Sequence, residues 1–283
     1  MNISICGAGT MGRGIAIACL QAGHSVVVFD LSELAISKSK DYIIAQMNKS
    51  VEKKKITQED ADTYLKNISY STIINDVAVC EIIIEAILEK PEAKFELFSS
   101  IENSGLADTA ILATNTSSLS VNLLSSKLRN PQNFVGLHFF NPANLMKLVE
   151  IVRSRQTSDE TITRCVKFIK DLGKTSVIAK DVPGFIVNRV ARNYYNEAMK
   201  IATENASEPE QIDIIMKSLG FKMGPFELMD LIGNDVNLEV TKSVYEQYFH
   251  EARFTPSTMQ QEIVNAGMYG RKTGKGFHKY EEK

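Results

Sequence analysis

Two side chains in neighbouring apolar segments could carry acid–base chemistry. Of the four histidines, only His138 lies inside a strongly apolar stretch, residues 134–140, and Glu150 lies inside the next one, residues 148–152. An acid flanked by aliphatic side chains needs a polar partner, and adjacent strands would bring His138 to it. A carboxylate beside an imidazole orients the ring and stabilises its protonated form, which suits a base that accepts an alcohol proton during hydride transfer. A structural ion pair is the alternative interpretation.

A glycine turn near the N-terminus has the spacing of a dinucleotide-binding loop. The β-prone residues 2–6 and the apolar helical segment that follows are joined by Gly7-Ala8-Gly9-Thr10-Met11-Gly12. In such a loop Gly7 permits the tight turn, Gly9 lets the backbone approach a pyrophosphate, and Gly12 allows close packing of helix on strand. The pattern of strand, glycine turn and helix therefore predicts a site for the phosphates of a dinucleotide.

Asp30 indicates which dinucleotide this turn would bind. It stands at the end of a second β-prone run, residues 25–29, and follows Gly12 by 18 residues. That spacing is close to the ~20 residues at which an acid binds the adenosine ribose. An acid there repels a 2′-phosphate, and residues 31–37 contain no Arg or Lys to receive one, so the sequence favours NAD over NADP.

The elements around these residues predict a doubly wound, Rossmann-type α/β sheet, mostly parallel, with the later strands open to antiparallel pairing. Nearly continuous apolar runs suit a sheet that is covered on both faces, and they recur at 81–88, 110–113, 134–140 and 148–152. A charged helical hairpin is expected at about 32–66 and a helix at 91–103.

The strand pattern stops at Pro183-Gly184, and the sequence after it is helical in pattern up to a glycine-rich end. We therefore expect a dinucleotide-binding domain over residues 1–182 and a smaller all-helical domain over residues 183–283.

Composition argues against several other classes of protein. The 283 residues carry a net charge of -2, which provides no general attraction to nucleic acid. The four cysteines lack any Cys-x-x-Cys pair and no metal-ligand cluster is visible, so buried free thiols and no metal are expected. No stretch approaches the ~18 apolar residues of a membrane span, and the first strand begins at Asn2, so a cytoplasmic protein without membrane contact is expected.

Seven ordered motifs span nearly the whole chain. The motifs begin with residues 7–12 and continue with Asn115-Thr116-Ser117-Ser118-Leu119, Gly136-Leu137-His138-Phe139-Phe140-Asn141-Pro142, Met146-Lys147-Leu148-Val149-Glu150, Pro183-Gly184-Phe185-Ile186-Val187-Asn188-Arg189, Met223-Gly224-Pro225-Phe226-Glu227-Leu228 and Gly270-Arg271-Lys272-Thr273-Gly274-Lys275-Gly276-Phe277. Together they resemble the motifs of the L-3-hydroxyacyl-CoA dehydrogenases, most closely the short bacterial 3-hydroxybutyryl-CoA dehydrogenases. The resemblance implies an NAD-dependent enzyme that interconverts (S)-3-hydroxyacyl-CoA and 3-ketoacyl-CoA in fatty acid or butyrate metabolism, and a homodimer formed through the helical domain.

The same resemblance implies roles for particular residues. His138 would be the general base and Glu150 its carboxylate partner, while Ser117 and Asn188 would hydrogen-bond the substrate. Lys53 lies where the family uses a basic residue toward coenzyme A, although a solvated face also accounts for the lysines at 53–55. The residues implied to bind NAD are Gly7, Gly9, Thr10, Met11, Gly12, Asp30, Glu89, Lys94 and Asn115.

Two other functions are compatible with parts of this pattern. A dehydrogenase of the same architecture could act on a free 3-hydroxy acid or a sugar acid, and activity on acetoacetyl-CoA separates it from the first interpretation. A non-catalytic NAD-binding protein would need the glycine turn but not the four candidate catalytic residues. Asn205, at a position where the family usually has glycine, leaves the local turn geometry open.

Overall fold

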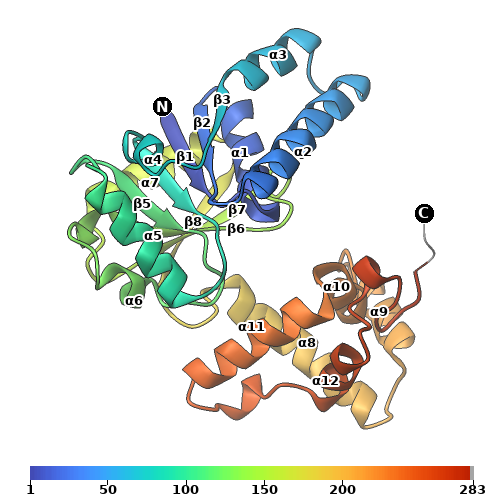
Figure 1. Ribbon diagram of the computed structural model, residues 1–283. Helices are drawn as coiled ribbons and strands as arrows, with labels where there is room; N and C mark the ends of the chain where they lie inside the picture. Colours follow the sequence, from blue (N-terminus) through green and yellow to red (C-terminus); the bar gives the residue numbers. More distant parts are fainter. Residues whose placement is uncertain (281–283) are drawn as a thin grey trace. The chain divides into compact units, whose positions relative to one another are not determined.

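The structure is a computed structural model that describes residues 1–280. The chain divides into two compact units, Met1–Asp181 and a second one that begins at Val182 (Figure 1). Each unit has its own hydrophobic core.

An eight-stranded sheet forms the centre of the first unit (Figure 1). The strands are β1 (Asn2–Cys6), β2 (Ser25–Phe29), β3 (Ile68–Ser71), β4 (Ile82–Glu85), β5 (Ile111–Thr114), β6 (Phe134–Phe139), β7 (Leu148–Arg153) and β8 (Thr175–Lys180). Their order in the sheet is β3-β2-β1-β4-β5-β6-β7-β8. Within this sheet, β6 and β7 pair antiparallel and the other neighbours pair parallel. The chain order reverses between β1 and β4, so the predicted doubly wound sheet is confirmed.

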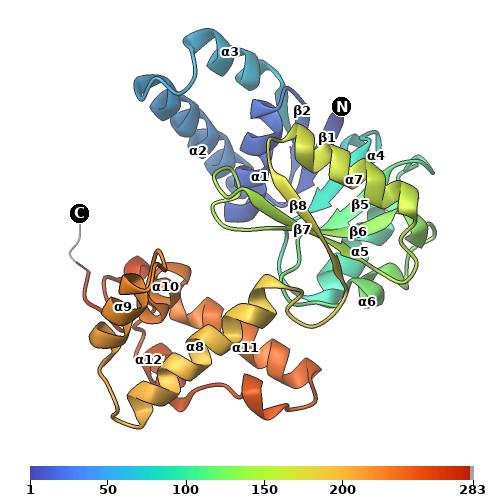
Figure 2. The ribbon, with the colours of Figure 1, turned by 180° about the vertical axis from the view of Figure 1, so that it is seen from behind.

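Helices cover both faces of this sheet, as the opposite views in Figures 1 and 2 show. They are α1 (Thr10–Gln21), α2 (Glu33–Glu52), α3 (Gln58–Lys66), α4 (Asn75–Ala78), α5 (Pro91–Asn103), α6 (Val121–Ser125) and α7 (Asp159–Asp171). Helix α1 packs on β1 and β2, and α7 packs on β6, β7 and β8. The two-sided cover explains why the inner strands are apolar along their whole length, with Ile3, Ile5, Ile83 and Ile84 fully buried.

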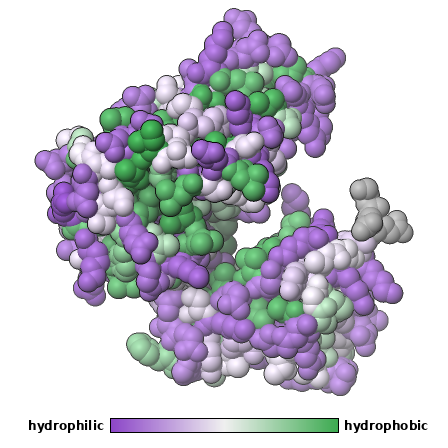
Figure 3. Space-filling model, in the orientation of Figure 1, coloured by the Kyte–Doolittle hydropathy of each residue, from purple (hydrophilic) through white to green (hydrophobic). Residues whose placement is uncertain are grey.

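Helices α2 and α3 form the predicted hairpin. Ser32 begins α2 by accepting a hydrogen bond from the Ala35 amide, and a reciprocal pair of hydrogen bonds between Thr57 and Asp60 begins α3. Lys53 directly follows α2, in the turn that leads to α3. This turn is the tip of the hairpin. The hairpin surface that is visible in Figure 3 is largely hydrophilic, as a hairpin that extends into solvent requires.

The sheet contains two strands that the apolar runs do not predict. These are β3 and β8, the strands at its two edges. Every residue of β3 is partly exposed to solvent, and Val177 and Ile178 of β8 are 39% and 54% exposed. An edge strand needs no continuous apolar run because it has a neighbour on one side only, which explains why the pattern missed both.

The second unit is helical, as predicted. Its helices are α8 (Val187–Thr203), α9 (Pro209–Ser218), α10 (Pro225–Ile232), α11 (Asn234–Gln247) and α12 (Thr258–Asn265). Tyr195, Met199, Phe226 and Met229 are at the centre of its core. Asn205, which follows α8, adopts a left-handed conformation with φ 56°. Asparagine tolerates this region better than most residues, so it can replace glycine at that turn.

Candidate active site

The imidazole of His138 lies between a carboxylate and a hydroxyl. Its Nδ1 is 2.7 Å from Glu150 Oε2, and its Nε2 is 3.1 Å from Ser117 Oγ. The side chains of His138 and Glu150 are only 4% and 1% exposed, so water hardly screens this pair. A carboxylate accepts hydrogen bonds, and it therefore selects the tautomer in which Nδ1 carries the proton and Nε2 presents its lone pair. The structure thus brings together three of the residues singled out in the sequence.

The register of the sheet makes this pairing. Strands β6 and β7 are antiparallel neighbours, and His138 lies directly opposite Glu150 in their register. The two residues after His138 make further contacts. The Phe139 amide donates a hydrogen bond of 2.9 Å to Asn115 Oδ1, and the Phe140 ring centroid lies 4.6 Å from that of His138. These contacts limit the rotation of the imidazole, so its orientation is set before any substrate binds.

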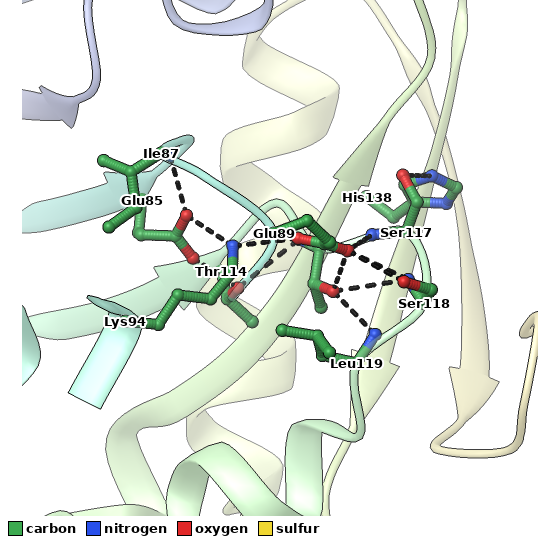
Figure 4. Close-up of polar contacts among 10 residues, drawn as sticks. Glu85, Ile87, Glu89, Lys94, Thr114, Ser117, Ser118, Leu119 and His138 are labelled. Carbon is green, nitrogen blue, oxygen red and sulfur yellow. Dashed lines mark hydrogen bonds and ion pairs between the residues drawn. The ribbon is translucent and has the colours of Figure 1, made fainter. Parts of the chain in front are cut away.

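A second charged group lies beside the first one and is drawn in Figure 4. Lys94 Nζ is 2.6 Å from Glu85 Oε1 and 3.1 Å from Glu89 Oε2. Glu85 is fully buried and Lys94 is 1% exposed, whereas the Glu89 side chain is 38% exposed. Glu85 also accepts hydrogen bonds from the Thr114 hydroxyl at 2.6 Å and the Ile87 amide at 2.8 Å. Both of its carboxylate oxygens are therefore occupied as acceptors.

Glu89 connects this group to the turn that carries Ser117. Its Oε1 accepts hydrogen bonds from the Thr116 hydroxyl at 2.5 Å and from the amides of Ser117 and Ser118 at 2.8 and 3.1 Å (Figure 4). Burial by itself raises the pKa of Glu89, but the Lys94 ammonium and the donors of this turn outweigh it, so the pKa is lowered. The ionised carboxylate thus fixes the backbone that positions the Ser117 hydroxyl toward His138.

The glycine turn has the geometry that a phosphate site requires. Gly7 has φ 113°, and a Cβ on Gly12 would lie 1.8 Å from the Gly7 carbonyl oxygen, so neither position accepts a larger residue. Space is open around Gly9, where a Cβ would meet nothing within 4 Å. Thr10 and Met11 begin α1, whose first turn has neither a side-chain cap nor an acidic residue. Its amides and the positive end of the helix dipole are therefore available to an anion.

Asp30 lies beside this turn, at the end of β2, and is half-buried. Its Oδ2 accepts a hydrogen bond of 2.9 Å from the Ala8 amide, and its Oδ1 accepts one of 2.9 Å from the Ser32 amide. The carboxylate thus braces the glycine turn, which is a structural role that the sequence did not reveal. Each oxygen keeps a further lone pair for a ligand hydroxyl.

Two of the predicted site residues lie elsewhere in the chain. Asn188 is half-buried in the first turn of α8, in the second unit, where its backbone carbonyl accepts a hydrogen bond of 3.3 Å from Arg192 Nε. Lys53 is exposed at the tip of the α2–α3 hairpin and does not join the group around His138. The roles of Asn188 and Lys53 therefore remain predictions.

Sequence reasoning missed the contribution of Glu85, Thr114 and Thr116. A signal for Glu85 was present, because it follows Ile82-Ile83-Ile84 and an acid next to such a run needs a partner, as Glu150 does. The two threonines carried no such signal, since hydroxyl residues after a strand are common in turns.

Within residues 1–280, no three side chains of His, Cys, Asp or Glu are grouped as metal ligands, and no helix is long and apolar enough to cross a membrane. All four cysteines are buried and free, as predicted. Burial raises the pKa of Cys80 to about 11 and those of Cys19 and Cys165 to about 12, so these thiols stay protonated near neutral pH.

Comparison with protein families gives two matches that together span nearly the whole chain. Residues 2–182 match the model described as 3-hydroxyacyl-CoA dehydrogenase, NAD binding domain. Residues 184–280 match the model described as 3-hydroxyacyl-CoA dehydrogenase, C-terminal domain.

Individual relatives carry names from the same group of enzymes. The chain is 41% identical to the 3-hydroxyadipyl-CoA dehydrogenase of Escherichia coli, in an alignment that covers 98% of this chain but only 58% of that protein. It is 39% identical to a probable 3-hydroxybutyryl-CoA dehydrogenase of Deinococcus radiodurans, with 99% of this chain and 100% of the relative covered. Among solved structures, the (S)-3-hydroxybutyryl-CoA dehydrogenase of Ralstonia eutropha superposes with a TM-score of 0.94 at 37% identity, with 99% of each chain covered.

Proposed function

Because the chain belongs to the 3-hydroxyacyl-CoA dehydrogenase family, we propose that it interconverts (S)-3-hydroxyacyl-CoA and 3-ketoacyl-CoA by hydride transfer. We propose 3-hydroxybutyryl-CoA and acetoacetyl-CoA as the substrate pair, following the names of the relatives that the chain matches along their whole length. The observation that carries the proposal is the buried His138–Glu150 pair with Ser117 at the other ring nitrogen. Cofactor binding alone requires none of these three side chains.

The cofactor of this family is NAD, and the first unit fits it. The open space at Gly9 and the uncapped first turn of α1 suit a pyrophosphate, and Asp30 keeps lone pairs for ribose hydroxyls. No lysine or arginine occupies residues 30–37, the segment that begins at Asp30 and in which a 2′-phosphate would need a basic residue. These residues therefore favour NAD over NADP. Bound NAD supplies the nicotinamide C4 that accepts or returns hydride.

His138 performs the proton transfer in this proposal. In the oxidative direction, Nε2 accepts the proton of the substrate hydroxyl while hydride leaves carbon 3 of the acyl group. In the reductive direction, the same nitrogen returns the proton to the oxygen on carbon 3. General acid–base catalysis of this kind typically contributes ~10²–10⁴-fold.

Glu150 assists by holding the ring and compensating its charge. The carboxylate accepts a hydrogen bond from Nδ1–H, which makes Nε2 the acceptor nitrogen, toward the Ser117 hydroxyl in this structure and toward the substrate hydroxyl in the proposed reaction. When His138 becomes an imidazolium, the buried negative charge at 2.7 Å stabilises it. A structural ion pair would make the same contact, so turnover of a Glu150 variant distinguishes the two roles.

Three further contacts complete the proposal for the substrate. Ser117 would donate its hydroxyl proton to the oxygen on carbon 3, since this hydroxyl already lies 3.1 Å from His138 Nε2. Asn188 would hydrogen-bond the substrate near the thioester, and Lys53 would contact the coenzyme A phosphates. The family resemblance supports the last two roles.

We also propose a homodimer formed through the helical unit. Helix α9 and the turn after it expose large apolar side chains, with Ile214 at 59%, Ile215 at 56%, Leu219 at 71% and Phe221 at 50%. Several large apolar side chains exposed on one helix and the turn after it are typical of a protein–protein contact. A cytoplasmic location stays a prediction from the sequence.

The direct test follows cofactor oxidation at 340 nm with several acyl substrates. We expect rapid oxidation of NADH, slow oxidation of NADPH, and a preference for acetoacetyl-CoA over longer 3-ketoacyl-CoA esters. A 3-ketoadipyl-CoA arm tests the activity named for the Escherichia coli relative. Activity on free acetoacetate with none on its coenzyme A ester would instead support a dehydrogenase of free hydroxy acids.

A further inference from the structure

The charged group formed by Glu85, Lys94 and Glu89 contains more negative than positive charge. Two carboxylates share one ammonium, at 2.6 Å and 3.1 Å, which leaves one negative charge in excess. Glu85 and Lys94 are almost completely buried, so solvent screens them weakly. Glu85 acts as an acceptor on both oxygens, because it receives the Lys94 ammonium, the Ile87 amide and the Thr114 hydroxyl.

The topology places this excess charge at one end of the cofactor site. The glycine turn follows β1, Asp30 follows β2 on one side of it, and Glu85 ends β4 on the other side. In register, Glu85 lies between Cys6 of β1 and Thr114 of β5. A dinucleotide whose adenosine ribose is bound at Asp30 extends across the turn toward the carboxyl ends of β4 and β5. The nicotinamide half of a bound dinucleotide would therefore lie on the side of Glu85 and Ser117.

The two redox forms of the cofactor respond differently to such a charge. The nicotinamide ring is cationic in NAD⁺ and uncharged in NADH, whereas the remainder of the molecule is the same in both. A buried negative charge near the ring therefore lowers the free energy of the oxidised form relative to the reduced form. A group that served only to brace the fold would stabilise the two complexes equally.

We propose that Glu85, by giving the Glu85–Lys94–Glu89 group its excess negative charge, shifts the bound cofactor toward the oxidised form. Glu85 is a positioning residue in this proposal, since it acts on the nicotinamide ring through Lys94 and through the electrostatic field of its own charge. The inference rests on the proposed function, because it requires the nicotinamide to bind beside β4 and β5. It concerns the relative affinity for NAD⁺ and NADH, which the proposed function does not specify.

The test measures the dissociation constants of NAD⁺ and NADH separately, without acyl substrate, by calorimetry or NADH fluorescence. The readout is the ratio of the NAD⁺ constant to the NADH constant. Glu85→Gln keeps the shape of the side chain and removes its charge, so we expect this ratio to rise about tenfold, as for a unit charge at about 12 Å and an effective dielectric constant near 20. Lys94→Gln removes the positive charge instead, and we expect its ratio to fall.

Two matched controls separate the charge from structural damage. Glu81→Gln removes the same charge from an exposed residue just before β4, at the end of the strand opposite to Glu85. Thr114→Val removes a hydrogen bond to Glu85 without a change of charge. We expect both variants to keep the wild-type ratio, even where the stability or the absolute affinities change.

A ratio in Glu85→Gln within twofold of wild type, or one that moves in the same direction as in Lys94→Gln, overturns the inference. If Glu85→Gln does not fold, Glu89→Gln removes the other negative charge and must raise the ratio, while Lys94→Gln must lower it. Wild-type protein that fails to bind NADH contradicts the proposed function instead, so the two failures are distinguishable.

Discussion

Replacement of Glu150 by glutamine should separate cofactor binding from chemistry. The change keeps the shape of the side chain opposite His138 in the register of β6 and β7, but it replaces the charged acceptor 2.7 Å from Nδ1 by an amide. The amide cannot compensate an imidazolium. It can also donate its own N–H to Nδ1, which would move the ring proton to Nε2 and remove the lone pair that accepts the substrate proton.

The magnitude follows from the burial of this pair. Because the two side chains are 4% and 1% exposed, water cannot replace the lost carboxylate. We expect kcat to fall ~10²–10⁴-fold, which corresponds to a barrier higher by about 2.7–5.4 kcal/mol. The glycine turn lies on other strands, so the dissociation constant for NADH should stay within about threefold of wild type, since separated sites behave nearly independently.

Steady-state kinetics with acetoacetyl-CoA measures kcat, and NADH fluorescence titration measures binding. Glu96→Gln is a matched control, because it makes the same change at an exposed position of α5 and should keep normal turnover. Circular dichroism melting of both variants verifies the fold. If Glu150→Gln turns over at a near-normal rate, the carboxylate belongs to a structural ion pair and the catalytic role assigned to it is wrong.

Three other changes test the cofactor turn, the hairpin and the pH dependence of stability. Asp30→Ala should weaken NAD binding much more than NADP binding in calorimetric titrations, since it removes a ribose acceptor and a repulsive charge; equal losses would mean that the brace to the Ala8 amide is its whole role. Lys53→Ala should raise the KM for acetoacetyl-CoA but not for a truncated thioester, and equal effects on both would make this residue part of a solvated face. His24 is buried, and burial lowers its pKa below 6.5, so its contribution to stability is present above about pH 6.5 and is lost as the pH falls through the lowered value. His24→Gln should therefore flatten the decline in the free energy of unfolding between about pH 7 and pH 5 in urea titrations, and an unchanged slope would contradict this assignment.

Local patterns were sufficient to predict most of the fold. The glycine turn, the apolar runs of the inner strands and the capped α2–α3 hairpin each depend on residues that are close in sequence. The edge strands β3 and β8 were not predicted, because partial exposure leaves them without a continuous apolar run. Local signals thus identify the inner strands, which have a neighbour on each side and are buried. They miss the edge strands, which have one neighbouring strand and are partly exposed.

The sequence by itself determined which residue types could perform the chemistry. An acid and a histidine in two neighbouring apolar runs indicated a buried pair, since each needs a polar partner away from water. Only the tertiary structure decided that β6 and β7 run antiparallel with His138 opposite Glu150, because a shift of one residue would turn one side chain to the other face of the sheet. It also decided that Glu85, Lys94 and Glu89 form one charged group that holds the Ser117 turn. These contacts join residues from different strands and loops, and their distances depend on how the whole sheet packs, which no local pattern of residues encodes.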